Sequence, residues 1–277
     1  MKHRGFFTKQ IVNKTANGKG LAVAGSGELR CWNLLTTVDH TEANAAGGLQ
    51  RRAGRAPKTH TQGGEEIRRS MNRIGMARPS WDDEMRQAAV DTLDSLHWVK
   101  GPQGKAFGKE FSEYCNAVQG TPCQSGSVAL WGALRLLEIG PGDEVLVPSL
   151  TYIATATCVS LVGATPVFVD VEPDHWCLDI NALEAARTPQ TKAIIAVHLF
   201  GQMCDDALPN WCEQHGIAYI EDAAQAHGAV AGSGTKAGGI GDVACFSFFP
   251  SKNLAVGGEG GMMVTRRQDL AARMDAL

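Results

Sequence analysis

Two side chains of opposite charge follow apolar runs in the second half of the chain. Lys252 comes shortly after the run 244–248, and Asp222 closes the run 216–222. A partly desolvated lysine amine can react with a carbonyl carbon, and a carboxylate at the end of a buried strand can hold a cationic group. Taken singly, each residue also fits an ordinary role. Lys252 would then be a surface lysine in a loop, and Asp222 the N-cap of a helix that starts at 223–226.

A second pair of features indicates binding of an anion and of a flat ring. Ser125, Gly126 and Ser127 precede an apolar helical run, and backbone N–H groups at a helix start favour an anion. Ser247, five residues before Lys252, can add a hydroxyl to the same anion. Tyr152 follows another apolar run and can stack on a planar group. The alternatives are a plain N-cap at Ser125 and core packing for Tyr152.

Together these residue types match the four demands of pyridoxal phosphate (PLP). That cofactor needs a lysine for a Schiff base, an acid for its pyridine nitrogen, an anion cradle and a group against its ring. The glycines of 257–261 lack the strand-to-helix context and the trailing Lys-Ser/Thr of a nucleotide-binding loop, so we interpret them as a turn before the next strand. We interpret His198 and His227 as structural histidines with satisfied hydrogen bonds, and note that His227 lies close to Asp222 in sequence.

These residues need a scaffold, and the pattern of the chain predicts one. Short apolar runs alternate with helical patterns, which is typical of a mostly parallel sheet buried on both faces, with chemistry at the carboxyl ends of its strands. The expected strands are Glu144–Val147, Thr165–Val169, Ala193–Val197, Ala218–Glu221, Ala244–Phe248 and Gly261–Val264. The expected helices are Trp81–Leu96, Ala106–Val118, Ser125–Leu137, Ala154–Val162 and Asp205–His215.

The first predicted helix is amphipathic, with an apolar face for packing. Met85, Ala89, Leu93 and Leu96 fall on one side of it, and acidic residues are concentrated in its first turn.

Composition excludes several function classes. The formal net charge of −3 does not indicate a nucleic-acid or acidic-membrane partner. No run approaches the roughly 20 apolar residues of a membrane span, and no apolar core follows Lys2 and Arg4 as in a secretory signal. The eight cysteines form no C-x-x-C pair, so we expect no metal site, buried thiols and a reducing, cytoplasmic location.

Residues 1–70 differ in composition from the rest of the chain. They hold 12 Lys and Arg against 5 Asp and Glu and show no sustained apolar period. Such a segment buries too little apolar surface to offset its ordering entropy. We expect a disordered or non-native leader here, or alternatively a basic arm for an acidic partner, and we assign the folded domain to 71–277.

With these residues in order along one chain, the sequence resembles the DegT/StrS family of PLP-dependent nucleotide-sugar aminotransferases. The resemblance runs from about Arg78 to Leu277 through six motifs, of which any one alone is weak. The motifs are Ser125–Leu130, Gly140–Pro148, Gly163–Asp170, Val197–Gly201, Glu221–Gly228 and Phe246–Leu254. It implies a three-layer α/β/α large domain of the aspartate-aminotransferase-like kind (PLP fold type I).

The resemblance also implies a role for each residue. Lys252 would be the Schiff-base lysine, Asp222 the partner of the pyridine nitrogen, and Gln225 a neighbour of the ring hydroxyl. The remaining roles are stacking by Tyr152 and phosphate binding by Gly126, Ser127 and Ser247. The implied reaction moves an amino group, with glutamate as the expected donor, to a nucleotide-linked keto-sugar. Some relatives have histidine at the lysine position and are PMP-dependent deoxygenating or dehydrating enzymes, so Lys252 favours aminotransfer.

The chain departs from the family pattern at both ends. The family has a small C-terminal domain that supplies substrate and cross-subunit phosphate contacts, and this sequence stops at Leu277, before that domain. We therefore expect a fragment of such a protein. Members of the family usually form homodimers, and the missing domain puts a homodimer of this chain in doubt. The alternatives are a degenerate or regulatory PLP-binding protein and another PLP reaction, such as a lyase, on the same fold.

Overall fold

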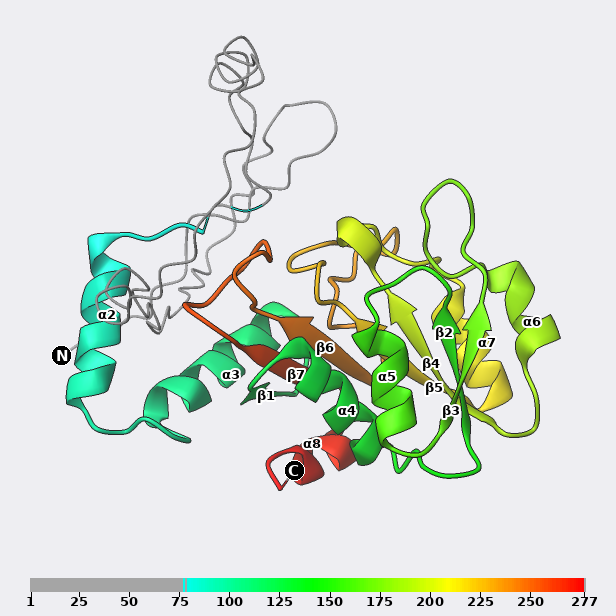
Figure 1. Ribbon diagram of the computed structural model, residues 1–277, viewed down its shortest axis with the longest axis horizontal. Helices are drawn as coiled ribbons and strands as arrows, with labels where there is room; N and C mark the ends of the chain where they lie inside the picture. The colour runs from blue at the N-terminus through cyan, green and yellow to red at the C-terminus, as the bar shows by residue number, and fades with distance from the viewer. Residues whose placement is uncertain (1–76, 78, 277) are drawn as a thin grey trace, which may run out of the picture.

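The computed structural model describes residues 77 and 79–276 (Figure 1). The leader predicted for residues 1–70 lies outside the described residues. No described helix is long and apolar enough to cross a membrane.

The described part is built on one seven-stranded sheet with the strand order β1-β7-β6-β5-β4-β2-β3. Strands β2 to β6 pair in parallel with one another, whereas β7 is antiparallel to both β6 and β1. The strands are β1 (Gln119–Cys123), β2 (Glu144–Pro148), β3 (Thr165–Val169), β4 (Thr191–Val197), β5 (Ala218–Asp222), β6 (Val243–Ser247) and β7 (Gly261–Thr265).

Helices cover both faces of this sheet and give three layers (Figure 1). One face carries α4 (Gly126–Leu136), α5 (Ala154–Leu161) and α8 (Gln268–Met274). The other carries α3 (Pro102–Tyr114), α6 (Leu183–Ala186) and α7 (Leu208–His215). Helix α2 (Asp83–Asp94) precedes α3, and two short 3₁₀ turns, η1 (Ile180–Ala182) and η2 (Leu199–Gly201), lie in connections after β3 and β4.

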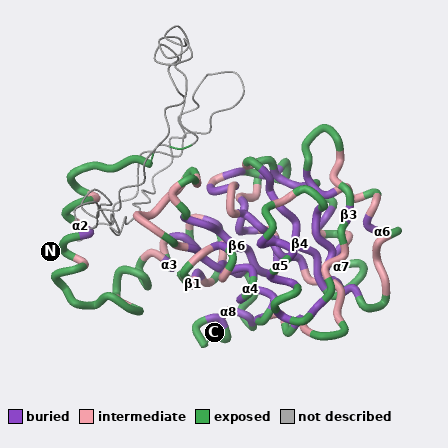
Figure 2. Tube along the Cα trace, in the orientation of Figure 1, coloured by how far each residue is buried: buried purple, intermediate pink, exposed green. Residues whose placement is uncertain are grey.

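The buried strand residues point alternately to the two faces of the sheet, so the core has one part on each face. Val145 and Val147 of β2 pack with the α4 and α5 cluster, whereas Leu146 between them joins the cluster on the opposite face. On β5, Ile220 belongs to the α4 side and Tyr219 to the α7 side. The central strands are buried on both faces (Figure 2), which explains their continuous apolar sequences.

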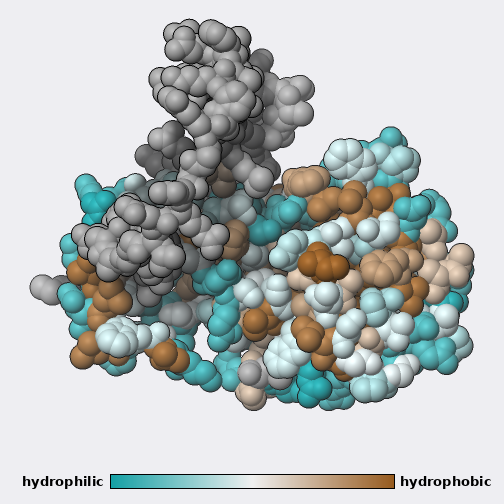
Figure 3. Space-filling view, viewed as in Figure 1, coloured by the Kyte–Doolittle hydropathy of each residue, from teal (hydrophilic) through white to brown (hydrophobic). Residues whose placement is uncertain are grey.

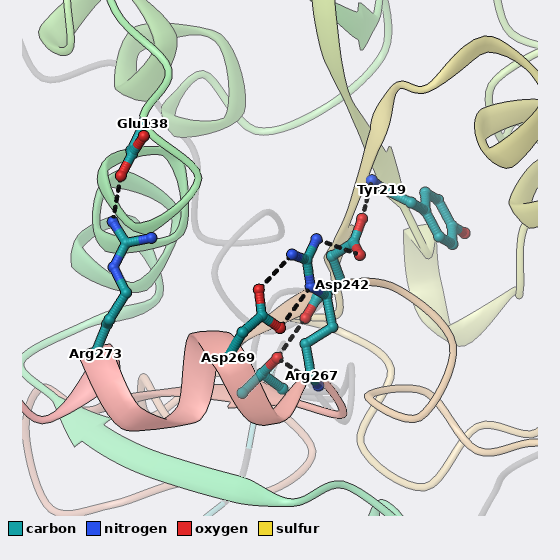
Figure 4. A network of polar contacts seen from close by, with 7 residues as sticks. Glu138, Tyr219, Asp242, Arg267, Asp269 and Arg273 are labelled. Carbon is teal, nitrogen blue, oxygen red and sulfur yellow. Dashed lines mark hydrogen bonds and ion pairs between the residues drawn. The ribbon is translucent and has the colours of Figure 1, made fainter.

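Helix α8 is tied to the body by arginines at its two ends (Figure 4). Arg267 donates to Asp242 at 3.2 Å and to Asp269 at 3.1 Å, and Arg273 donates to Glu138 at 2.8 Å. Asp242 also accepts from the backbone N–H of Tyr219, so this network joins the helix to the start of β5.

The six predicted strands and five predicted helices are confirmed within a few residues, and the fold class with them. Strand β1 was not predicted, because its sequence Gln-Gly-Thr-Pro-Cys lacks an apolar run. The predicted apolar face of α2 is only partly buried. Ala89 is its buried residue, while Leu93 is 39% and Leu96 73% exposed. Figure 3 shows this apolar surface over α2 at the left of the view.

Close packing of α3 on β1 gives a matched pair of substitutions. A Cβ added at Gly108 would lie 2.3 Å from the carbonyl oxygen of Gly120, whereas one at Gly104, in the same helix, meets nothing within 4 Å. We expect Gly108→Ala to lower the free energy of unfolding by about 1–3 kcal/mol through overpacking. Gly104→Ala should raise it by up to about 1 kcal/mol through helix propensity. Urea denaturation measures both, and equal effects of the two substitutions would contradict this packing.

Candidate active site

Asp222 ends β5 on the face that carries α5. Its side chain is buried and accepts hydrogen bonds from the Thr155 hydroxyl at 2.9 Å and from the Ala224 N–H at 3.2 Å. Burial raises the pKa of this carboxyl above its ordinary value, although Thr155, Ala224 and the charge of Lys252 each lower it. No helix begins at 223–226, so the alternative of an N-cap is wrong.

Lys252 lies in the loop that follows β6, the strand paired with β5. Asp222 is in register with Cys245 on β6, so both segments leave the sheet at the same edge. A turn in which the Lys252 N–H donates to the Phe249 carbonyl at 2.8 Å holds the lysine backbone. The Lys252 ammonium lies within electrostatic range of Asp222, since it lowers the pKa of that carboxyl.

Gln225 lies three residues after Asp222 in the same segment. Its Oε1 accepts from the backbone N–H of Phe200 at 2.8 Å, which fixes the orientation of the amide. The two Nε2–H donors are thereby left for an oxygen acceptor. Phe200 has a left-handed φ of 55°, uncommon for a bulky residue, and the bond from Gln225 helps to hold it there.

The start of α4 lies against the end of β6. Ser125 caps the helix by accepting from the Val128 N–H, so the plain N-cap is present, and the first-turn amides of Gly126 and Ser127 precede the intrahelical bonds. A Cβ on Gly126 would lie 2.7 Å from the Cβ of Ser247. Only glycine therefore allows this approach, which brings three predicted anion-binding residues together.

Tyr152 lies in the connection between β2 and α5, beside the Thr155 that binds Asp222. Its side chain is 71% exposed, so the alternative of core packing is wrong. The backbone carbonyl of Tyr152 accepts from the Thr155 N–H at 3.0 Å.

Glu221, which sequence reasoning missed, is the buried neighbour of Asp222 and points to the opposite face of the sheet. It accepts from the backbone N–H groups of Gly238, Ile240 and Gly241 and contacts His198 Nε2 at 3.0 Å. Burial raises the pKa of this carboxyl, but these partners outweigh burial and the net shift is downward. The sequence offered one signal for Glu221, namely two consecutive acids at the end of an apolar strand. Neighbouring residues of a strand face opposite sides of the sheet, so each face must carry one of the two acids.

The two histidines singled out in the sequence differ in their hydrogen bonding. His198 is satisfied as predicted, because Nε2 meets Glu221 and Nδ1 accepts from the Cys204 N–H at 3.2 Å. For His227 the prediction is wrong in part. Nδ1 contacts Asn253, but within the described part of the chain Nε2 is buried without a partner.

The cysteine prediction can be compared with the structure for Cys115 to Cys245. All seven described cysteines are free, and all are buried except Cys123, which is partly buried. Burial raises the pKa of the Cys123 thiol to about 11, as expected for an unreactive structural thiol.

Comparison with known proteins gives the family. Residues 79–277 match the DegT/DnrJ/EryC1/StrS aminotransferase family, and the chain belongs to it. UDP-N-acetyl-3-dehydro-α-D-glucosamine 3-aminotransferase of Acidithiobacillus ferrooxidans is 47% identical over 196 residues, which are 70% of this chain and 53% of that protein. The chain thus spans about half the length of the curated relatives it matches.

Solved structures give the same result for the fold. DesV of Streptomyces venezuelae is 47% identical, with a TM-score of 0.68 over 70% of this chain and 52% of that one. NtdA of Bacillus subtilis, solved with bound PMP, is 31% identical, with a TM-score of 0.64 over 73% of this chain and 48% of that one. The α/β fold is aspartate-aminotransferase-like, as the sequence predicted.

The compensated carboxylate at Glu221 should contribute strongly to stability. We expect Glu221→Gln to lower the free energy of unfolding by about 3 kcal/mol at pH 7, because it removes the charge that four donors were arranged to bind. The pKa of Glu221 is lowered in the folded state, so this contribution is present at neutral pH and is lost as pH falls through the folded pKa. Urea denaturation from pH 7 to about pH 2 measures it, with exposed Glu213→Gln as control. A constant difference across this range would contradict the assignment.

Asp222 should behave in the opposite way. Its folded pKa is raised, so the folded state gains stability as pH falls toward that pKa, and the charged form is a cost at pH 7. We expect Asp222→Asn to raise the free energy of unfolding of the PLP-free chain by about 1 kcal/mol at pH 7. The gain should shrink on acidification. Destabilisation by this substitution at pH 7 would show that burial does not dominate at Asp222.

Proposed function

We propose that residues 71–277 form the PLP-binding domain of an aminotransferase that transfers an amino group to a nucleotide-linked keto-sugar. Membership of the aminotransferase family supports the reaction class. The sugar substrate is supported by the relative from Acidithiobacillus, which is named for an aminotransfer to a UDP-linked sugar. The matched part of this chain covers about half the length of these relatives, so activity is proposed for the whole protein to which this domain corresponds.

The observation that carries the proposal is the buried carboxylate of Asp222. Two hydrogen bonds and the charge of Lys252 do not offset its desolvation, as the raised pKa indicates. A protonated pyridine nitrogen would supply the missing cationic donor. The residues around it fit the rest of PLP. The Gly126–Ser247 approach offers amide and hydroxyl donors for a phosphate, and the ring of Tyr152 is free on the surface.

When bound, PLP supplies an electron sink that lets the carbon next to the amino nitrogen lose its proton. In the proposed site Asp222 would keep the pyridine nitrogen protonated, and the Nε2–H group of Gln225 would donate to the ring oxygen. The amides of Gly126 and Ser127 and the hydroxyl of Ser247 would hold the phosphate, and Tyr152 would cover the ring. Lys252 would hold the cofactor through its amine and, once displaced by the amino substrate, would serve as the base that moves the proton. Glutamate as donor and a homodimeric assembly are inferred from the family resemblance.

Spectroscopy of the purified chain tests the cofactor assignment. We expect added PLP to give a visible absorbance band of lysine-bound cofactor, and Lys252→Ala to abolish it. Lys109→Ala, at a surface lysine of α3 whose side chain is 77% exposed, is the matched control and should keep the band. Borohydride reduction and peptide mass spectrometry should locate PLP on Lys252. An unchanged band in Lys252→Ala, or label on another lysine, would remove the assignment.

The reaction class requires a second measurement. Glutamate or glutamine added to the PLP-loaded protein should bleach the visible band as the amino group is transferred, with the matching keto acid released. A stable band with either donor would favour a non-catalytic binding protein. Release of other carbonyl products would instead favour a lyase.

A further inference from the structure

His227 occupies an aromatic pocket between the two segments of the candidate site. Its side chain is 2% exposed, and its ring lies 5.3 Å from that of Phe246, 5.5 Å from Phe248 and 6.5 Å from Phe111, measured between centroids. Because burial disfavours the cation, the pKa of His227 is lowered to about 4 and the imidazole is neutral at pH 7.

Asn253, the residue after Lys252, contacts His227 at two points, one on the imidazole and one on the backbone. Its Nδ2 donates to the backbone carbonyl of His227 at 3.1 Å, which orients the amide so that Oδ1 faces His227 Nδ1 at 2.7 Å. Nδ1 must therefore carry the proton and donate to Asn253. The other nitrogen, Nε2, is buried and has no hydrogen bond of good geometry from the described residues, although the backbone of Ser247 lies close enough to the ring to raise its pKa against the larger effect of burial.

An imidazole in this pocket costs stability. An unsatisfied buried acceptor costs roughly 1–3 kcal/mol, whereas phenylalanine would fill an aromatic pocket without that cost. The hydrogen bond through Nδ1 is therefore the feature that favours histidine, and what it fixes is the loop after β6.

That loop is also restrained by the turn from Phe249 to Lys252 and by the packing of Leu254 and Val256 against the aromatic core. It has no helix or strand between β6 and β7, and the Phe248 backbone bonds to Gly260 and Val256 close its two ends. The contact between Asn253 and His227 restrains the middle of the loop, directly beside Lys252. His227 itself belongs to the segment after β5 that carries Asp222 and Gln225. The pair therefore connects the lysine segment to the acid segment.

We propose that His227 and Asn253 are positioning residues that hold the Lys252 segment at a fixed place relative to Asp222. This inference rests on the proposed function, in which Lys252 binds PLP. Without the contact, the lysine backbone would sample more conformations, and the cost of ordering it would fall on cofactor binding.

Three variants of the full chain test the proposal. His227→Phe removes the donor and keeps the aromatic packing. Asn253→Leu removes both contacts at similar volume. His227→Asn offers an amide N–H near the position of Nδ1 and serves as the conservative rescue. His97→Phe, at an exposed histidine between α2 and α3, is the matched control.

Hydrogen exchange of the PLP-free protein, followed by mass spectrometry of peptides covering 248–256, is the first measurement. We expect exchange at least tenfold faster in His227→Phe and Asn253→Leu, with unchanged exchange in β5 and β6. The midpoint of thermal unfolding in His227→Phe should stay the same or rise, because the unsatisfied nitrogen is removed. A residue with a merely structural role would instead lower global stability and leave the local exchange pattern unchanged.

The dissociation constant of PLP, from the visible band, is the second measurement. The dissociation constant should rise about tenfold in His227→Phe and in Asn253→Leu. It should rise no further when the two substitutions are combined, because the two residues form one contact, and it should recover in His227→Asn. Unchanged exchange in 248–256 would overturn the proposal whatever the PLP result. Absence of the visible PLP band in the wild-type chain would contradict the proposed function. The exchange measurement would still decide whether His227 and Asn253 restrain the loop.

Discussion

The carboxylate of Asp222 is buried at the end of a central strand without enough donors to offset its desolvation, and the rest of the site is arranged around it. Its neighbour Glu221 shows the contrast. Glu221 points to the other face, where three backbone amides and His198 compensate it fully. One strand end thus carries two buried acids, one compensated by the protein itself and one whose hydrogen bonds and nearby Lys252 charge do not offset its burial. An incompletely compensated acid of this kind is a candidate for binding a further cationic group.

The parallel sheet explains how distant residues meet at that acid. Strands β2, β4, β5 and β6 end at one edge, and the segments that follow them carry Tyr152, Phe200, Gln225 and Lys252. The pleat then selects the face. Asp222 and Ser247 point toward α4 and α5, where Thr155 binds the acid and Gly126 lets the helix start approach β6. The histidine of the next segment reaches across to Asn253, so the β5 and β6 segments are also joined away from the sheet.

The strands and the fold class could be predicted because their apolar runs reflect burial on both faces. The positions of Asp222 and Lys252 at or after strand ends followed from the same runs. Strand β1 could not be predicted, since an antiparallel edge strand needs no apolar run. The helical period of α2 was visible, but what its apolar face contacts was not, and Leu96 is exposed. The roles of Glu221 and His227 depend on backbone amides and on residues far along the chain, and no local pattern records such partners. The orientation of the Gln225 amide likewise depends on a single backbone contact with Phe200.

A crystal structure of the chain with PLP tests the central claim most directly. The account predicts continuous electron density between Lys252 Nζ and the cofactor, and an Asp222 carboxylate oxygen at about 2.7–2.9 Å from the pyridine nitrogen. Cofactor density joined to a different lysine, or a pyridine nitrogen directed away from Asp222, would contradict it.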